Sequence, residues 1–111
     1  MIDGRVIRGL VGSNPLFAKS LGRIKDPKLQ AEIATAIRSL LFQQMDALPR
    51  KLKFHQLHNK QVVSVLDKTK KVSAWSFHVT SNDVYKASCT FEDSIVYLRL
   101  VDEHDVIDKN P

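Results

Sequence analysis

The chain has 111 residues and a mass of 12.6 kDa, so we expect one domain over residues 1–111. Hydrophobic residues make up 43% and charged residues 26% of the chain, which is typical of a globular protein and excludes a disordered one. The single cysteine excludes an internal disulfide and a cysteine-based zinc site. No run of 18 apolar residues and no signal peptide is present, so we expect a cytoplasmic protein.

Positive charge is concentrated in the middle of the chain. The 17 Lys and Arg residues outnumber the 12 Asp and Glu residues, which gives a net charge of +5. Residues 47–86 hold 8 bases and 2 acids, whereas residues 87–111 hold 2 bases and 6 acids. This distribution indicates an anion-binding surface in the middle third, and a basic surface that is merely solvated is the alternative.

The first half of the sequence predicts a short strand over 6–11 and then two helices. Asn14-Pro15 and Asp26-Pro27 each combine a favourable N-cap with proline at the first helical position. After the second pair, apolar side chains recur at helical spacing: Leu29, Ile33, Ile37, Leu40 and Leu41. We therefore expect a helical hairpin joined at residues 25–26, whose second helix runs over 27–46 and ends before Pro49.

The second half changes to the alternation of β-strands. Segments 52–57 and 62–66 predict two short strands with a turn at 59–60. Residues 73–80, 84–91 and 95–101 predict three longer strands, separated by turns at 81–83 and 92–93. The chain stops soon after His104-Asp105, so we expect no helix after the last strand. The predicted fold class is α+β, with the helical hairpin packed on one face of a twisted antiparallel sheet.

The predicted turns also set the register of the three longer strands. A three-residue loop at 81–83 pairs Val79 with Tyr85, Phe77 with Ala87 and Trp75 with Cys89. A two-residue loop at 92–93 pairs Phe91 with Ser94, Cys89 with Val96, Ala87 with Leu98 and Tyr85 with Leu100. Both registers give one continuous apolar face, which we assign to the helices, and a slip of one residue would reverse it.

The opposite face of this predicted sheet is polar and basic. It carries Ser76, His78, Lys86, Ser88, Tyr97 and Arg99. In the predicted register Lys86 lies between His78 and Arg99, and like charges directly across a ladder are unfavourable. Such a row of nitrogen bases favours a bound anion, with Ser88 and Tyr97 adding hydroxyls and a ring for base stacking. A solvated face with splayed side chains is the alternative.

Other chemistry finds little support. The four histidines form no His-x₃-His pair and no compact ligand triad, so we expect no metal ion and no cofactor. No strained nucleophile turn of the type needed for Ser/His/Asp catalysis is present. His104, just past the last predicted strand, is expected at the edge of the basic face.

The order of these motifs resembles that of the RelE/ParE toxin superfamily of bacterial type II toxin–antitoxin systems. Residues 72–111 carry the resemblance, in the parts Trp75-Ser76-Phe77-His78-Val79, Tyr85-Lys86, the strand 95–101 and His104-Asp105. The two preceding helices and the segment LKFHQL follow the family's order. The resemblance implies a strand–helix–helix–sheet fold of the RelE kind.

The resemblance also implies a function. Many members, including the RelE/HigB-like mRNA interferases, are endoribonucleases that cut mRNA, often on the ribosome, and each is neutralised by a cognate antitoxin. Such an enzyme would inhibit translation and arrest growth. Other members inhibit DNA gyrase and lack a ribonuclease site, and a non-catalytic nucleic-acid-binding module is a further alternative. By position, Lys86 replaces a phosphate-contacting arginine, His104 an active-site residue, and His78 a basic residue on the preceding strand.

Metal-free RNA cleavage needs a base for the 2′-OH, an acid for the leaving oxygen and cations at the phosphorus. We assign His104 as acid or base, with Asp105 orienting it or contributing directly, and His78 as the second acid/base or a phosphate contact. Lys86 and Arg99 form the electrostatic clamp. RNA contacts are assigned to Arg99, Tyr97, Ser88, Lys53 and His55.

Overall fold

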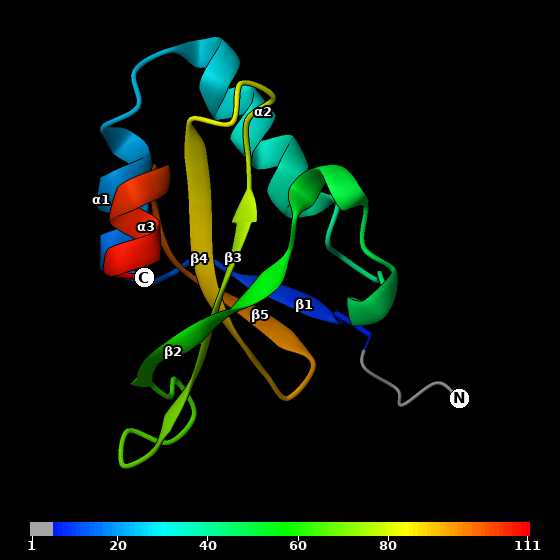
Figure 1. Cartoon of the computed structure of the whole chain (residues 1–111), viewed down its shortest axis with the longest axis vertical. Coiled ribbons are helices and arrows are strands. Elements are labelled where there is room, and N and C mark those ends of the chain that lie inside the picture. Colours follow the sequence, from blue (N-terminus) through cyan, green and yellow to red (C-terminus); the bar gives the residue numbers. More distant parts are fainter. Residues whose placement is uncertain (1–5) are drawn as a thin grey trace.

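The computed structural model describes residues 6–111, which form an α+β fold with three α-helices and one five-stranded sheet. In chain order the elements are β1 (Gly9–Val11), α1 (Pro15–Gly22), α2 (Pro27–Arg38), β2 (His55–Val63), β3 (Lys71–His78), β4 (Tyr85–Glu92), β5 (Ile95–Glu103) and α3 (His104–Lys109). The strand order is β1-β5-β4-β3-β2, and only the β1–β5 pair is parallel. Strands β2 and β5 cross in Figure 1, as expected of a twisted sheet. No helix within residues 6–111 combines the length and the apolarity needed to cross a bilayer.

Both predicted helix starts are confirmed, but the second helix is shorter than predicted. The side chain of Asn14 accepts from the Leu16 amide, and that of Asp26 accepts from the Lys28 amide. The second helix, α2, ends at Arg38 rather than at residue 46. The following turn places Phe42 at a φ of 64°, where its amide donates to the Ile7 carbonyl. Backbone pairing with residues 6–7 thus replaces the last helical turns.

The prediction of two short strands over 52–66 is wrong, because the structure has one strand, β2, over His55–Val63. The register between β2 and β3 shifts between Gln56 and Gln61, and Asn59 has a φ of 60°. The residues that predicted a turn at 59–60 therefore form an irregularity within a continuous strand, which asparagine tolerates because it enters the left-handed region readily.

The β3–β4 register is confirmed. Trp75 lies opposite Cys89, Phe77 opposite Ala87 and His78 opposite Lys86. The β4–β5 register is wrong. The observed pairs are Phe91 with Val96, Cys89 with Leu98, Ser88 with Leu100, Ala87 with Val101 and Lys86 with Asp102. Two features change the predicted pairing. The tight turn lies at residues 93–94 instead of 92–93, and a bulge follows it in β5.

The turn and the bulge have clear backbone signatures. Asp93 and Ser94 have φ values of 52° and 65°, as in a type I′ hairpin, which lets Glu92 pair with Ile95. The register then shifts at Ser88/Cys89, so Arg99 lies in β5 without a directly opposite residue. This extra residue explains why Leu98 and Val101, three positions apart, both face the core.

The helices α1 and α2 cover the predicted apolar face of the sheet, which confirms that assignment. The buried core cluster is Ile7, Phe17, Ile24, Ile33, Ile37, Leu40, Leu52, Phe77, Val79, Ala87, Cys89, Val96, Leu98 and Val101. The amide of Val101 donates to the buried hydroxyl of Ser20 at 3.0 Å, which fixes α1 against β5.

The expectation that no helix follows the last strand is wrong. Helix α3 begins directly after β5, and the side chain of its residue Ile107 is fully buried. Its six residues are too few to show a helical period in the sequence. The helix matters for function because it packs against β4 and β5, beside the polar face of the sheet.

Candidate active site

The polar face of the sheet is not the open platform that the sequence predicts. Ser76 and Ser88 are fully buried, and the exposed fractions of Lys86 and His78 are only 3% and 7%. The cause is the chain after β5, because α3 and residues 110–111 contact this face through polar groups.

Lys86 has acidic neighbours instead of the predicted basic ones. It lies opposite Asp102, because the bulge in β5 moves Arg99 away from the paired position. Its Nζ atom donates to Oδ1 of Asp108 at 2.9 Å. The predicted row of three adjacent nitrogen bases is therefore wrong between Lys86 and Arg99, and the ammonium of Lys86 is neutralised within the fold.

Asp108 bridges Lys86 and His104. Its second oxygen, Oδ2, lies 3.1 Å from Nδ1 of His104, one helical turn away. Burial raises the pKa of Asp108, but hydrogen bonding and charge from Lys86 outweigh it, so the pKa is lowered and the carboxylate is ionised at neutral pH. The predicted partner, Asp105, is 3.7 Å from His104 Nδ1 and 91% exposed. Sequence reasoning missed Asp108 because the i, i+4 spacing is informative only on a helix.

His78 lies beside His104. The two rings are 5.8 Å apart between centroids and meet edge to face at 64°. Burial, followed by the charge of Lys86, lowers the pKa of His78, and Asp83 acts in the opposite direction. Nδ1 of His78 is 3.0 Å from Oδ1 of Asp83, but this contact lacks hydrogen-bond geometry. The structure therefore places a nearly buried imidazole next to a half-exposed one.

Lys53 and His55 lie at the exposed edge of this cluster. Lys53 ends the short 3-10 turn before β2 with a φ of 48°, and its charge helps lower the pKa of His78. His55 lies opposite Ser76, and its Nδ1 atom is 2.6 Å from the Lys53 carbonyl oxygen. These two exposed residues add cationic and hydrogen-bonding groups where solvent reaches the site.

The other predicted RNA contacts form a separate group. The Ser88 hydroxyl and Nε of Arg99 both donate to the Pro111 oxygen, each at 3.1 Å. Tyr97 lies opposite Thr90, which places it farther along β4 from Lys86 than Ser88 is. The structure thus brings His78, His104 and Lys86 together but does not bring Tyr97 to them.

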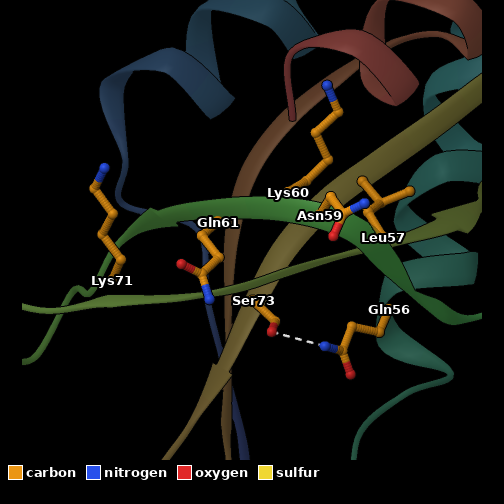
Figure 2. A pocket seen from close by; sticks show the side chains of 7 residues that line it. All are labelled: Gln56, Leu57, Asn59, Lys60, Gln61, Lys71 and Ser73. Carbon is orange, nitrogen blue, oxygen red and sulfur yellow. Dashed lines mark hydrogen bonds between the residues drawn. The ribbon is translucent and has the colours of Figure 1, made fainter.

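A hollow lies along the irregular part of β2, between Gln56 and Gln61 (Figure 2). This polar groove is lined by Gln56, Leu57, Asn59, Lys60, Gln61, Lys71 and Ser73. The Gln56 amide donates to the Ser73 hydroxyl at 2.7 Å across the two strands. In Figure 2 the Lys60 side chain extends from β2 toward α3, where its Nζ atom donates to the Lys109 carbonyl at 3.2 Å.

No group of three or more metal-binding side chains occurs in the part of the chain that the structure describes. Comparison with protein-family models, with curated proteins and with solved structures finds no match for this chain. Function must therefore be inferred from the site itself. Its chemistry is that of an imidazole pair, one member oriented by an ionised carboxylate, next to exposed cations.

Proposed function

We propose that this chain is a metal-independent endoribonuclease of the RelE toxin type, which cuts mRNA in the cytoplasm and is neutralised by a cognate antitoxin. The main support is the contact between His78 and His104, with ring centroids 5.8 Å apart. Two imidazoles in contact can divide the roles of acid and base, which RNA transphosphorylation requires and which needs no metal ion. The resemblance to the RelE/ParE superfamily points to the same reaction.

His104 is the residue that reacts with substrate in this proposal. Its side chain is 46% exposed, whereas His78 is nearly buried. The Asp108 carboxylate, 3.1 Å from Nδ1, favours a proton on Nδ1 by charge and leaves Nε2 as the free base, which can remove the proton of a 2′-OH. The 2′ oxygen then attacks the adjacent phosphorus and the bond to the 5′ oxygen breaks. That oxygen takes the proton that the protonated form of His78 donates as the acid. The products are a 2′,3′-cyclic phosphate and a 5′-hydroxyl.

Asp108 and Lys86 act as positioning residues. Lys86 is 3% exposed and donates to Asp108, so it does not offer its ammonium to a substrate phosphate. It keeps Asp108 ionised, and Asp108 fixes the orientation of His104. The assignment of Lys86 as a direct clamp is therefore replaced by an indirect one. Charge on the reacting phosphate is stabilised by the exposed cation Lys53 and by His55 at the same edge.

The test is cleavage of single-stranded RNA by the purified chain in the presence of a chelator. His104→Ala should reduce the cleavage rate about 10²- to 10⁴-fold, which is the usual contribution of general acid–base catalysis. Lys68→Ala, which removes one exposed charge from the turn before β3, is the matched control and should cleave normally. Product ends are mapped to identify the cyclic phosphate, and the assay is repeated with translating ribosomes.

Two results would contradict the proposal. Full cleavage activity in His104→Ala would exclude the assigned base. Growth arrest on induction with intact mRNA and a DNA-damage response would instead indicate a gyrase-directed toxin. Induction without growth arrest, and with no cleavage in either assay, would leave a nucleic-acid-binding module as the better description.

A further inference from the structure

Residues 108–111 place hydrogen-bond acceptors on a set of donors that belong to the sheet. The Pro111 oxygen accepts from Ser88 and Arg99, and the Lys109 carbonyl accepts from Lys60. Lys86 likewise donates to the side chain of Asp108. Three of these four donors, Lys60, Lys86 and Arg99, are cationic groups. The end of the described chain therefore occupies this face in the way that an anion would.

One donor beneath this segment remains unused. Ser76 lies directly opposite Ser88 and is fully buried. Among residues 6–111, its hydroxyl has no hydrogen-bond partner. Buried polar groups are nearly always paired, so an unpaired hydroxyl beside two donors that share one acceptor needs an explanation. The Pro111 oxygen accepts from Ser88 and Arg99, but the Ser76 hydroxyl next to them finds no acceptor.

We propose that Ser76, Ser88 and Arg99 form a cradle for one phosphate group of a single-stranded RNA, and that Asn110 and Pro111 are an internal strap that occupies it. This inference rests on the proposed function, which supplies RNA as the ligand. A phosphate offers several oxygens in place of one, so it can accept from the guanidinium and from both hydroxyls. The unpaired Ser76 hydroxyl is then the position that the strap fails to fill.

The cradle lies next to the histidine cluster. Ser88 is two residues from Lys86 on β4, and Ser76 is two residues from His78 on β3, which corresponds to about 7 Å along each strand. It would therefore hold a phosphate that neighbours the one at His104. Arg99 reaches this position because the bulge in β5 displaces it from the regular ladder. Burial lowers the pKa of Arg99, but the guanidinium stays charged.

The strap lowers the apparent affinity of the chain for RNA, because only chains with an open strap can bind. If the strap is closed in about nine chains of ten, removing it should tighten binding about tenfold. The test compares the full chain with one that ends at Lys109. The probe is a fluorescent single-stranded 2′-O-methyl RNA, which cannot be cleaved, and the readout is anisotropy across a series of salt concentrations.

The shortened chain should bind about five- to tenfold more tightly than the full chain with the same salt dependence, because bound chains have an open strap in both cases and make the same phosphate contacts. Arg99→Ala in the shortened chain should remove the gain in affinity and flatten the salt dependence by about 0.7 for one lost phosphate contact, whereas Lys68→Ala in the same background should keep the gain. Unchanged affinity in a folded shortened chain would overturn the proposal. Because the probe resists cleavage, a failure of the ribonuclease proposal leaves this result readable.

A second measurement uses the full chain and does not depend on the shortened one. In the free chain the Asn110 amide donates to the Val106 carbonyl at 2.8 Å. Saturating 2′-O-methyl RNA should increase hydrogen exchange of the Asn110 amide relative to the free chain, because the strap is displaced. Exchange that is unchanged or slower at saturation would refute the strap, since ordinary binding protects the residues it covers.

Discussion

Removal of Asp108 should destabilise the fold more than removal of its partner, Lys86. In Asp108→Ala the ammonium of Lys86 stays 96% buried without the carboxylate that it contacts at 2.9 Å. In Lys86→Met the charge is lost together with its need for a partner, and the Asp108 carboxylate, which is 37% exposed, keeps water and His104 as neighbours. Removing Asp108 therefore leaves an unpaired buried charge, whereas removing Lys86 leaves a charge that is partly exposed.

The burial of the two groups sets the expected magnitudes. Breaking a fully buried pair from one side costs about 3–5 kcal/mol of unfolding free energy. Water can enter where the half-exposed Asp108 is removed, and Asp102 lies opposite Lys86, so we expect about 2–3 kcal/mol for Asp108→Ala. Lys86→Met keeps the volume and should cost about 1 kcal/mol or less. For a chain of this length, each kcal/mol lowers Tm by about 4 °C.

Urea unfolding of both single variants and of the double variant measures these differences directly. The double variant should be more stable than Asp108→Ala alone, because Lys86→Met removes the unpaired charge. Equal m-values across the set confirm that the native and unfolded states remain comparable. Two results would contradict this reasoning: a larger loss of unfolding free energy in Lys86→Met than in Asp108→Ala, or a loss in the double variant equal to the sum of the two single losses. Either would show that the unpaired, buried ammonium is not the cause of the destabilisation.

Two further predictions concern buried groups away from the cluster. Burial raises the pKa of Glu92, but hydrogen bonds from Ser64 and neighbouring groups outweigh it, so the pKa is lowered in the fold. Its contribution to stability is present above the ordinary glutamate pKa of about 4.3 and disappears as the pH falls through the lowered value. Glu92→Gln should therefore be less stable at pH 7 and should lose less stability on acidification, and a wild-type acid dependence in this variant would count against it. Burial also raises the pKa of the Cys89 thiol, so alkylation by iodoacetamide at pH 8 should follow unfolding, and labelling of native protein at the rate of a free thiol would contradict this.

Local signals in the sequence were reliable where one side chain determines the backbone. Asn14 and Asp26 cap their helices through their own side chains, and the three-residue loop predicted at 81–83 gives the β3–β4 register that the structure has. The end of α2 could not be predicted in this way. Leu40 is buried in the turn that follows α2, and a longer helix would also bury it. Its spacing from Ile33 and Ile37 therefore does not distinguish a turn from further helix.

The candidate site depends on features that a sequence pattern does not encode. A shift of one residue in the β4–β5 turn and one bulged residue, Arg99, moved that guanidinium away from Lys86. The shifted turn slides the strands by two residues and therefore leaves each side chain on its predicted face, whereas the bulge moves Leu100 opposite Ser88 and puts Val101 opposite Ala87. Burial patterns constrain which face a residue occupies, but they do not reveal an even slide or the position of a bulge.

The bulge and α3 act together on the polar face. With Arg99 directly across from Lys86, two cations would compete for the same acceptors. With Arg99 displaced, Asp108 is free to pair with Lys86 and orient His104, while Arg99 and Ser88 share the Pro111 oxygen. The single basic patch expected from composition is thereby divided into an imidazole centre and an adjacent donor cradle. In the proposed reaction on RNA, the imidazole centre would move protons and the donor cradle would hold the strand in place.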